Sequence, residues 1–87
     1  MEENPKFQAA ILEAVKEQLN SPESPYVKTQ YDRLLSEGIE EEEVMKMLGA
    51  VLAVEMWEMN VQERGFDEKG YIELLERLPD MSWLEEG

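Results

Sequence analysis

Apolar residues recur along this chain at steps of three and four, which is the spacing of one face of an α-helix. The pattern predicts four helices, over about residues 5–20, 25–37, 41–64 and 68–78, and a C-terminal tail over residues 79–87. No segment alternates apolar and polar residues as a half-buried strand would. We therefore expect a single all-α domain, a compact four-helix bundle-like array with short loops and a long central third helix.

Capping residues, prolines and glycines mark the helix boundaries. Asn4 and Ser24 each precede a proline, which is typical of a helix start. We expect Gly38 to end the second helix in the left-handed conformation and Gly65 to end the third in the same way. Asp67 is expected to cap the fourth helix.

The third helix contains the longest apolar segment, residues 47–54. A helix that is apolar on every side is surrounded by its neighbours. Gly49, Ala50 and Ala53 are small enough for another helix to approach closely. We expect this segment to be the hub of the core, and Trp83 in the tail to lie against the bundle.

Composition limits the chemistry that is available. The 87 residues include 21 acidic and 8 basic side chains, for a net charge of −13, and no histidine or cysteine. The chain therefore has no thiolate, no imidazole base and no nitrogen or sulfur ligands of the kind that zinc, copper and iron prefer. It also has no recognisable nucleophile–base pair or phosphate-binding glycine loop, so we expect no enzyme activity and no cofactor.

Charge and the N-terminal sequence also bear on location. Because the net charge repels nucleic-acid phosphates and anionic lipids, we expect neither direct nucleic-acid binding nor membrane docking. The N-terminus lacks the basic and apolar regions of a signal peptide, and no apolar run approaches the ~20 residues that span a bilayer. Without cysteine, nothing indicates an oxidising compartment. The sequence predicts a cytoplasmic protein.

Residues 65–76 can be aligned with the calcium loop of an EF-hand. The alignment puts Asp67 at the third position, Glu73 at the ninth and Glu76 at the twelfth. The loop also needs oxygen ligands at its first and fifth positions, which here are glycine and lysine. A helix end followed by a cap explains the same residues, so these three carboxylates are weak candidates and we expect no metal site.

Two further carboxylate features stand at the start and in the middle of the third helix. Residues 40–43 are all glutamate, and the helix dipole favours negative charge there. Successive helical residues point about 100° apart, so four in a row cannot converge on one ion. Glu55 interrupts the apolar segment, and we expect it to be buried or at the boundary, paired with a base such as Arg33 or Lys46.

Six methionines are a high number for this length. Met45, Met56 and Met59, together with Trp57, would form a deformable apolar surface that grips a partner helix. The alternative, which we favour for Met47, Met56 and Trp57, is that these side chains fill the core. If Trp57 faces inward, its replacement by alanine would cost about 3 to 5 kcal/mol.

The order of landmarks along the chain also resembles a known family. The landmarks are Asn4-Pro5, residues 14–19, Pro25, Tyr31, Arg33-Leu34, Gly38, Trp57, Gly65-Phe66-Asp67, Tyr71 and Leu78. Together they resemble a bacterial family of small helical proteins known as the domain of unknown function numbered 1841. Histidines in the first and third helices of that family could hold a metal. This chain has no histidine, so the resemblance implies neither a metal site nor an activity here.

The leading hypothesis is a small acidic helical module that binds another protein or a second copy of itself. The apolar third helix, the methionines and the lack of a reaction site favour it. Two alternatives stay open. One is a carboxylate-based divalent-cation binder, and the other is an acidic mimic of nucleic acid, which requires carboxylates gathered on one face.

Overall fold

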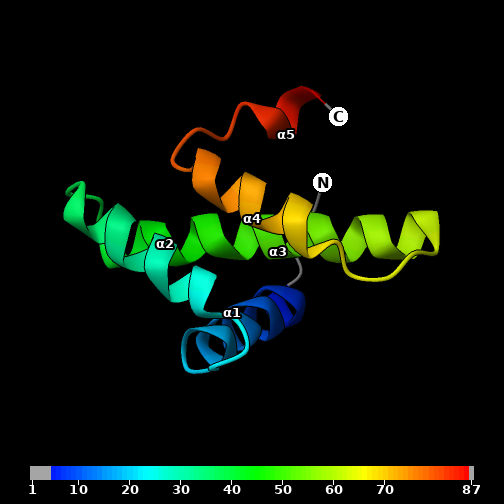
Figure 1. The fold of residues 1–87 in the computed structure, drawn as a ribbon, viewed down its shortest axis with the longest axis horizontal. Helices are drawn as coiled ribbons and strands as arrows, with labels where there is room; N and C mark the ends of the chain where they lie inside the picture. Colours follow the sequence, from blue (N-terminus) through cyan, green and yellow to red (C-terminus); the bar gives the residue numbers. More distant parts are fainter. Residues whose placement is uncertain (1–4, 87) are drawn as a thin grey trace.

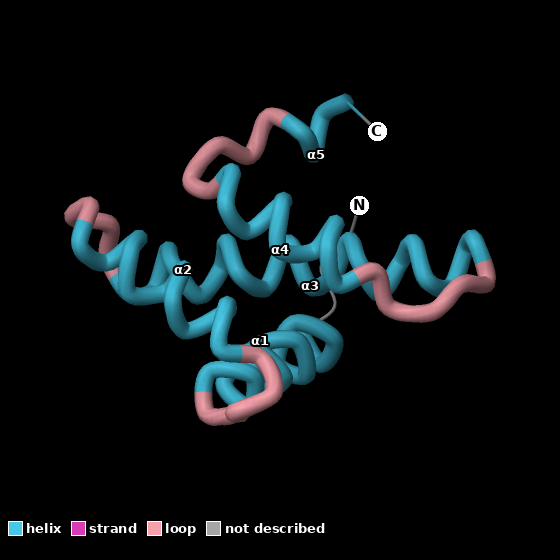
Figure 2. The backbone as a smooth tube through the Cα atoms, in the orientation of Figure 1, coloured by secondary structure: helices cyan, strands magenta, loops and turns pink. Residues whose placement is uncertain are grey.

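The computed structural model describes residues 5–86. It contains α1 (Pro5–Leu19), α2 (Pro25–Ser36), α3 (Glu41–Gln62) and α4 (Glu68–Arg77), followed by the single turn α5 (Trp83–Glu86). These residues include no strand, and the connections are short (Figure 2). The predicted all-α fold is confirmed, and α5 is an addition to it. The predicted cap at Asn4 lies outside the described residues.

The long α3 is the central element of the fold. It contacts α1, α2 and α4, and α2 also contacts α1 and α4. Figure 1 shows α1 crossing one side of α3, while α4 and α5 lie on the other. The buried apolar side chains form one core, made of Ile11, Val15, Val27, Leu34, Val44, Leu48, Val51, Leu52, Tyr71, Leu75, Leu78 and Trp83.

Small residues on α3 allow α1 to approach closely, as predicted. Gly49 is buried, and a Cβ atom there would lie 3.1 Å from the Cγ2 atom of Ile11. Trp83 is only 9% exposed, and its indole N–H donates to the backbone carbonyl of Asp80. The predicted docking of the tail tryptophan against the bundle is therefore confirmed.

The predicted cap at the C-terminal end of α2 is confirmed, whereas the predicted cap at its N-terminal end is not. Gly38 has φ +89°, its N–H donates to the carbonyl of Leu35, and the N–H of Ile39 donates to the carbonyl of Leu34. This pattern is a Schellman motif, as expected of a glycine there. At the other end, Ser24 makes no side-chain cap, so that prediction is wrong. Its buried hydroxyl instead donates to the carbonyl of Gln18 and ties the linker to α1.

The end of α3 also differs from the prediction. The helix ends at Gln62, and Glu63, not Gly65, adopts the left-handed conformation, with φ +50°. The N–H of Arg64 donates to the carbonyl of Met59. After this turn, Arg64 and Asp67 contact Glu55 on the side of α3.

Candidate functional site

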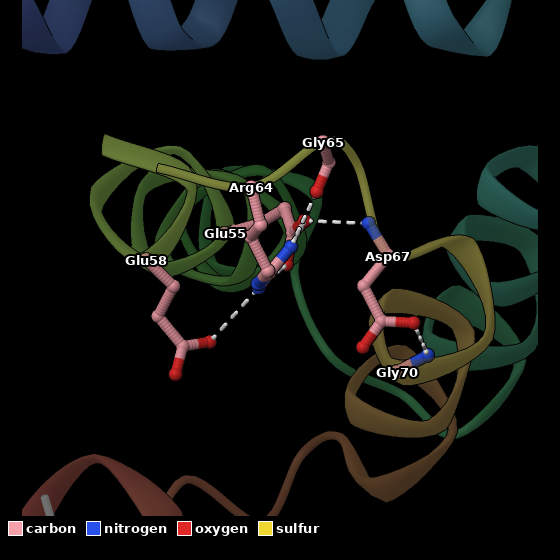
Figure 3. Close-up of polar contacts among 6 residues, drawn as sticks. All are labelled: Glu55, Glu58, Arg64, Gly65, Asp67 and Gly70. Atoms are coloured by element: carbon pink, nitrogen blue, oxygen red, sulfur yellow. Dashed lines mark hydrogen bonds and ion pairs between the residues drawn. The ribbon is translucent and has the colours of Figure 1, made fainter. Parts of the chain in front are cut away.

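Glu55 holds the α3–α4 connection against the side of α3. The residue is only 3% exposed. Two N–H groups of Arg64 donate to it, with Nη1–Oε2 at 2.8 Å and Nη2–Oε1 at 3.1 Å, and the backbone N–H of Asp67 donates to Oε2 at 2.9 Å. Figure 3 shows Arg64 between Glu55 and Glu58, with Asp67 on the connection that follows. A bidentate arginine–carboxylate pair of this kind is among the strongest polar contacts in proteins.

The surroundings of Glu55 keep it ionised. The hydrogen bond from Arg64 lowers the pKa of Glu55, burial opposes that shift, and the Asp67 N–H lowers the pKa further. Because both carboxylate oxygens accept hydrogen bonds, the group is suited to holding the chain and poorly suited to transferring protons. The geometry of Glu55 is therefore that of a structural clamp.

The prediction that Glu55 is buried or at the boundary and paired with a basic side chain is confirmed, but both named partners were wrong. The guanidinium of Arg33 donates to the carbonyls of Leu75 and Leu78 and binds Glu37, so it fastens α2 to the end of α4. Lys46 pairs with glutamates in the first turn of its own helix. Arg64 was missed because the sequence does not reveal that the connection after α3 turns back.

The three weak metal candidates do not form a metal-binding group in the structure. Asp67 is the N-cap of α4, and its Oδ1 atom accepts from the N–H of Gly70 at 3.1 Å, so the predicted cap is confirmed. Glu73 and Glu76 are exposed on α4. Among the side chains that the structure describes, no three carboxylates gather in a way that could hold a metal ion.

The second half of α3 exposes large apolar side chains. Trp57 is 63% exposed, Val61 55% and Met56 45%. The favoured assignment of Met56 and Trp57 to the core is therefore wrong, whereas Met45 and Met47 do pack against it.

Helix length gives the reason for this exposure. α3 has 22 residues, whereas α1 has 15 and α4 has 10. In Figure 1 the C-terminal part of α3 extends beyond the helices around it. The second half therefore has fewer neighbours to cover it.

An apolar groove leads toward these exposed side chains. It has a volume of about 510 Å³ and lies between α1 and α3, where the lining residues are Phe7, Gln8, Ile11, Leu12, Lys46, Gly49, Ala50 and Ala53. Ala53 precedes Met56 by three residues and Trp57 by four, so each of the two is a surface neighbour of Ala53 on α3.

We call the surface formed by Ala50, Ala53, Met56, Trp57 and Val61 the outer face of α3. Phe7 of α1 adjoins this apolar region and was not predicted as an interaction residue. The four-residue step from Trp57 to Val61 indicates that the two residues share a side of the helix, but not whether that side is exposed.

No family model matches this chain, and no curated protein or solved structure is significantly similar to it. Within the part of the chain that the structure describes, no helix is both long and apolar enough to cross a membrane.

Proposed function

We propose that this chain is a protein-interaction module that binds another protein chain through the outer face of α3 and the adjoining groove. The observation that carries the proposal is the 63% exposure of Trp57, with Val61 exposed one turn further along the same side of α3 and Met56 exposed next to it. Single exposed apolar residues are ordinary, but neighbouring ones that continue an apolar groove are typical of interaction sites. Tryptophan is also among the residues that contribute most to binding energy at interfaces.

The chemistry of the rest of the molecule supports the same proposal. Glu55 is the one buried acidic residue among the side chains that the structure describes, and Arg64 and Asp67 hydrogen-bond both of its carboxylate oxygens. Exposed carboxylates lie on each of the four long helices. Nucleic-acid mimicry needs them on one face, so this spread does not favour it. We propose that the interaction takes place in the cytoplasm, the compartment that the sequence predicts.

Photo-cross-linking tests the proposal. A photoreactive phenylalanine analogue replaces Trp57 in the full chain, and a second variant carries it at Glu73, which is also exposed but lies on α4. We expect irradiation in the source cell to give a discrete adduct from position 57 and none from position 73. The adduct's mass shows whether the occupant is a second copy or a different protein.

A further substitution shows whether the adduct depends on the outer face. Val61→Lys changes an exposed residue one turn from Trp57 and should leave the fold intact while abolishing the adduct. Equal adducts from positions 57 and 73, or an adduct at 57 that survives Val61→Lys, would overturn the proposal.

A further inference from the structure

We infer that the occupant of the outer face is a basic amphipathic helix of a different protein, an inference that rests on the proposed function. The groove and the outer face together form one linear apolar track along α3, from Lys46 to Val61. At 1.5 Å per residue, the track is about 22 Å long, which is the length of a helix of about 15 residues. An extended strand is a poor fit, because residues 5–86 offer no sheet edge to which it could bond.

The groove suits side chains spaced as they are on a helix. Ile11 and Leu12 form one wall, and Ala50 and Ala53 form the other, while Gly49 lies buried against Ile11. The small side chains of Ala50 and Ala53 leave room for leucine-sized side chains from the partner at positions i, i+3, i+4 and i+7. Trp57 and Met56 then cover the far end of the docked helix.

Charge decides against a second copy of this chain. The chain carries −13, and an interface between two copies would bring together twice that charge. Glu42 and Glu43 stand at the start of the track, and Glu63 stands at its end. Lys46, which lies 3.6 Å from the carboxylates of both Glu42 and Glu43, offsets only one of these two charges, so the start of the track keeps a net negative charge. A partner with lysines or arginines flanking its apolar stripe complements both ends.

The negative charge near the track also argues against a lipid surface as the occupant. An apolar face on a helix can enter a membrane interface, but such helices carry basic residues around that face and bind anionic lipids. The glutamates at both ends of this track repel those lipids. The geometry and charge therefore favour a basic helix.

A designed peptide provides the test. The probe is a 15-residue helix of leucine and lysine, with leucines at the i, i+3, i+4 and i+7 positions, titrated into the full chain at 0.15 M salt and followed by amide NMR. We expect shifts at Ala50, Ala53 and Trp57, and a dissociation constant that rises at least about tenfold in Trp57→Ala. Glu73→Gln, which removes an exposed carboxylate on α4, is the matched control and should bind the peptide as the wild type does.

Two further peptides separate apolar docking from charge attraction. The first keeps the lysines and replaces the leucines with serine, and the second keeps the leucines and replaces the lysines with glutamate. We expect both to bind at least about tenfold more weakly. The inference is overturned if the serine peptide binds equally well, if the glutamate peptide does, or if the shifts map only to the acidic start of α3.

The two proposals fail separately. A specific adduct at position 57, combined with a peptide that does not bind the track, leaves the interaction module standing and removes the basic helix. An adduct whose mass is that of a dimer does the same. If position 57 gives no specific adduct, the proposed function falls, and the basic helix falls with it.

Discussion

The two halves of α3 are both rich in apolar residues, yet they lie in opposite surroundings. In the first half, Val44, Leu48 and Val51 are almost completely buried. In the second half, Trp57 and Val61 are more than half exposed. Both segments are built from residues that favour burial, so hydrophobicity alone does not decide which half is core.

The cover supplied by neighbouring helices makes the difference. The first half lies among α1, α2 and α4, whereas the second half extends beyond α4 (Figure 1). At the junction, Glu55 turns the following connection back along α3 through Arg64 and Asp67 (Figure 3). That connection is short, and it leaves the side bearing Trp57 exposed.

The largest expected effect comes from the first half of α3. Leu48→Ala removes a side chain that is 1% exposed, and it should lower the free energy of unfolding by about 3 to 5 kcal/mol. Urea denaturation followed by circular dichroism measures the loss. A change below about 1 kcal/mol would contradict the assignment of this half to the core.

The next effect comes from the junction between the halves. Arg64→Met leaves the buried carboxylate of Glu55 with only the Asp67 N–H as a partner, and it should cost about 2 kcal/mol. The value is below that for a fully buried pair because Arg64 is itself 27% exposed. Denaturation at pH 7 measures this loss of unfolding free energy. The control is Lys28→Met, which breaks an exposed ion pair with Asp32 and should cost under about 0.5 kcal/mol.

The clamp also predicts a pH dependence. Because the folded-state pKa of Glu55 is lowered from 4.5, its contribution to stability is present above that value and is lost as the pH falls through the lower folded-state pKa. The difference in unfolding free energy between wild type and Glu55→Gln should be constant above about pH 6 and shrink in acid. A difference that grows in acid would show that the folded state does not favour the ionised form.

Some features of this fold depend on neighbouring residues in the sequence, and others depend on contacts between distant parts of the chain. Helix periodicity and the caps at Gly38 and Asp67 are local, and they were predicted correctly. The basic partner of Glu55 was not predicted correctly, because its identity depends on the path that the chain takes after α3.

The exposure of Trp57 was mispredicted for a related reason. Periodicity shows which residues share a side of the helix, but not whether a neighbour reaches that side. The resemblance to the 1841 family stays a prediction, as does the function.

A smaller effect is expected at the end of α3. Glu63→Gly places a residue without a Cβ atom in the left-handed position and removes a negative charge from the helix C-terminus. We expect the chain to become more stable by about 0.5 to 1 kcal/mol. Gln62→Gly, one position earlier in regular helix, should destabilise by a similar amount in thermal denaturation. A loss of stability in Glu63→Gly would argue against the left-handed turn.

The smallest expected effect comes from the second half of α3. Trp57→Ala should change the free energy of unfolding by less than about 0.5 kcal/mol, because the indole is largely solvated in the free chain. Trp83→Ala is the matched comparison, since it removes the same side chain from a 9% exposed site, and it should cost about 3 kcal/mol. Equal costs for the two substitutions would remove the distinction between core and outer face.

The accessibility of the two tryptophans in the intact chain tests the central claim most directly. The chain is labelled with 5-fluorotryptophan, and ¹⁹F NMR is recorded with increasing amounts of a soluble nitroxide, with Trp57→Phe used to assign the two signals. We predict strong broadening of the Trp57 signal at every protein concentration and little broadening of the Trp83 signal. Equal protection of both signals, or a Trp57 signal that becomes protected as the protein is concentrated, would contradict an outer face that is open to a different partner.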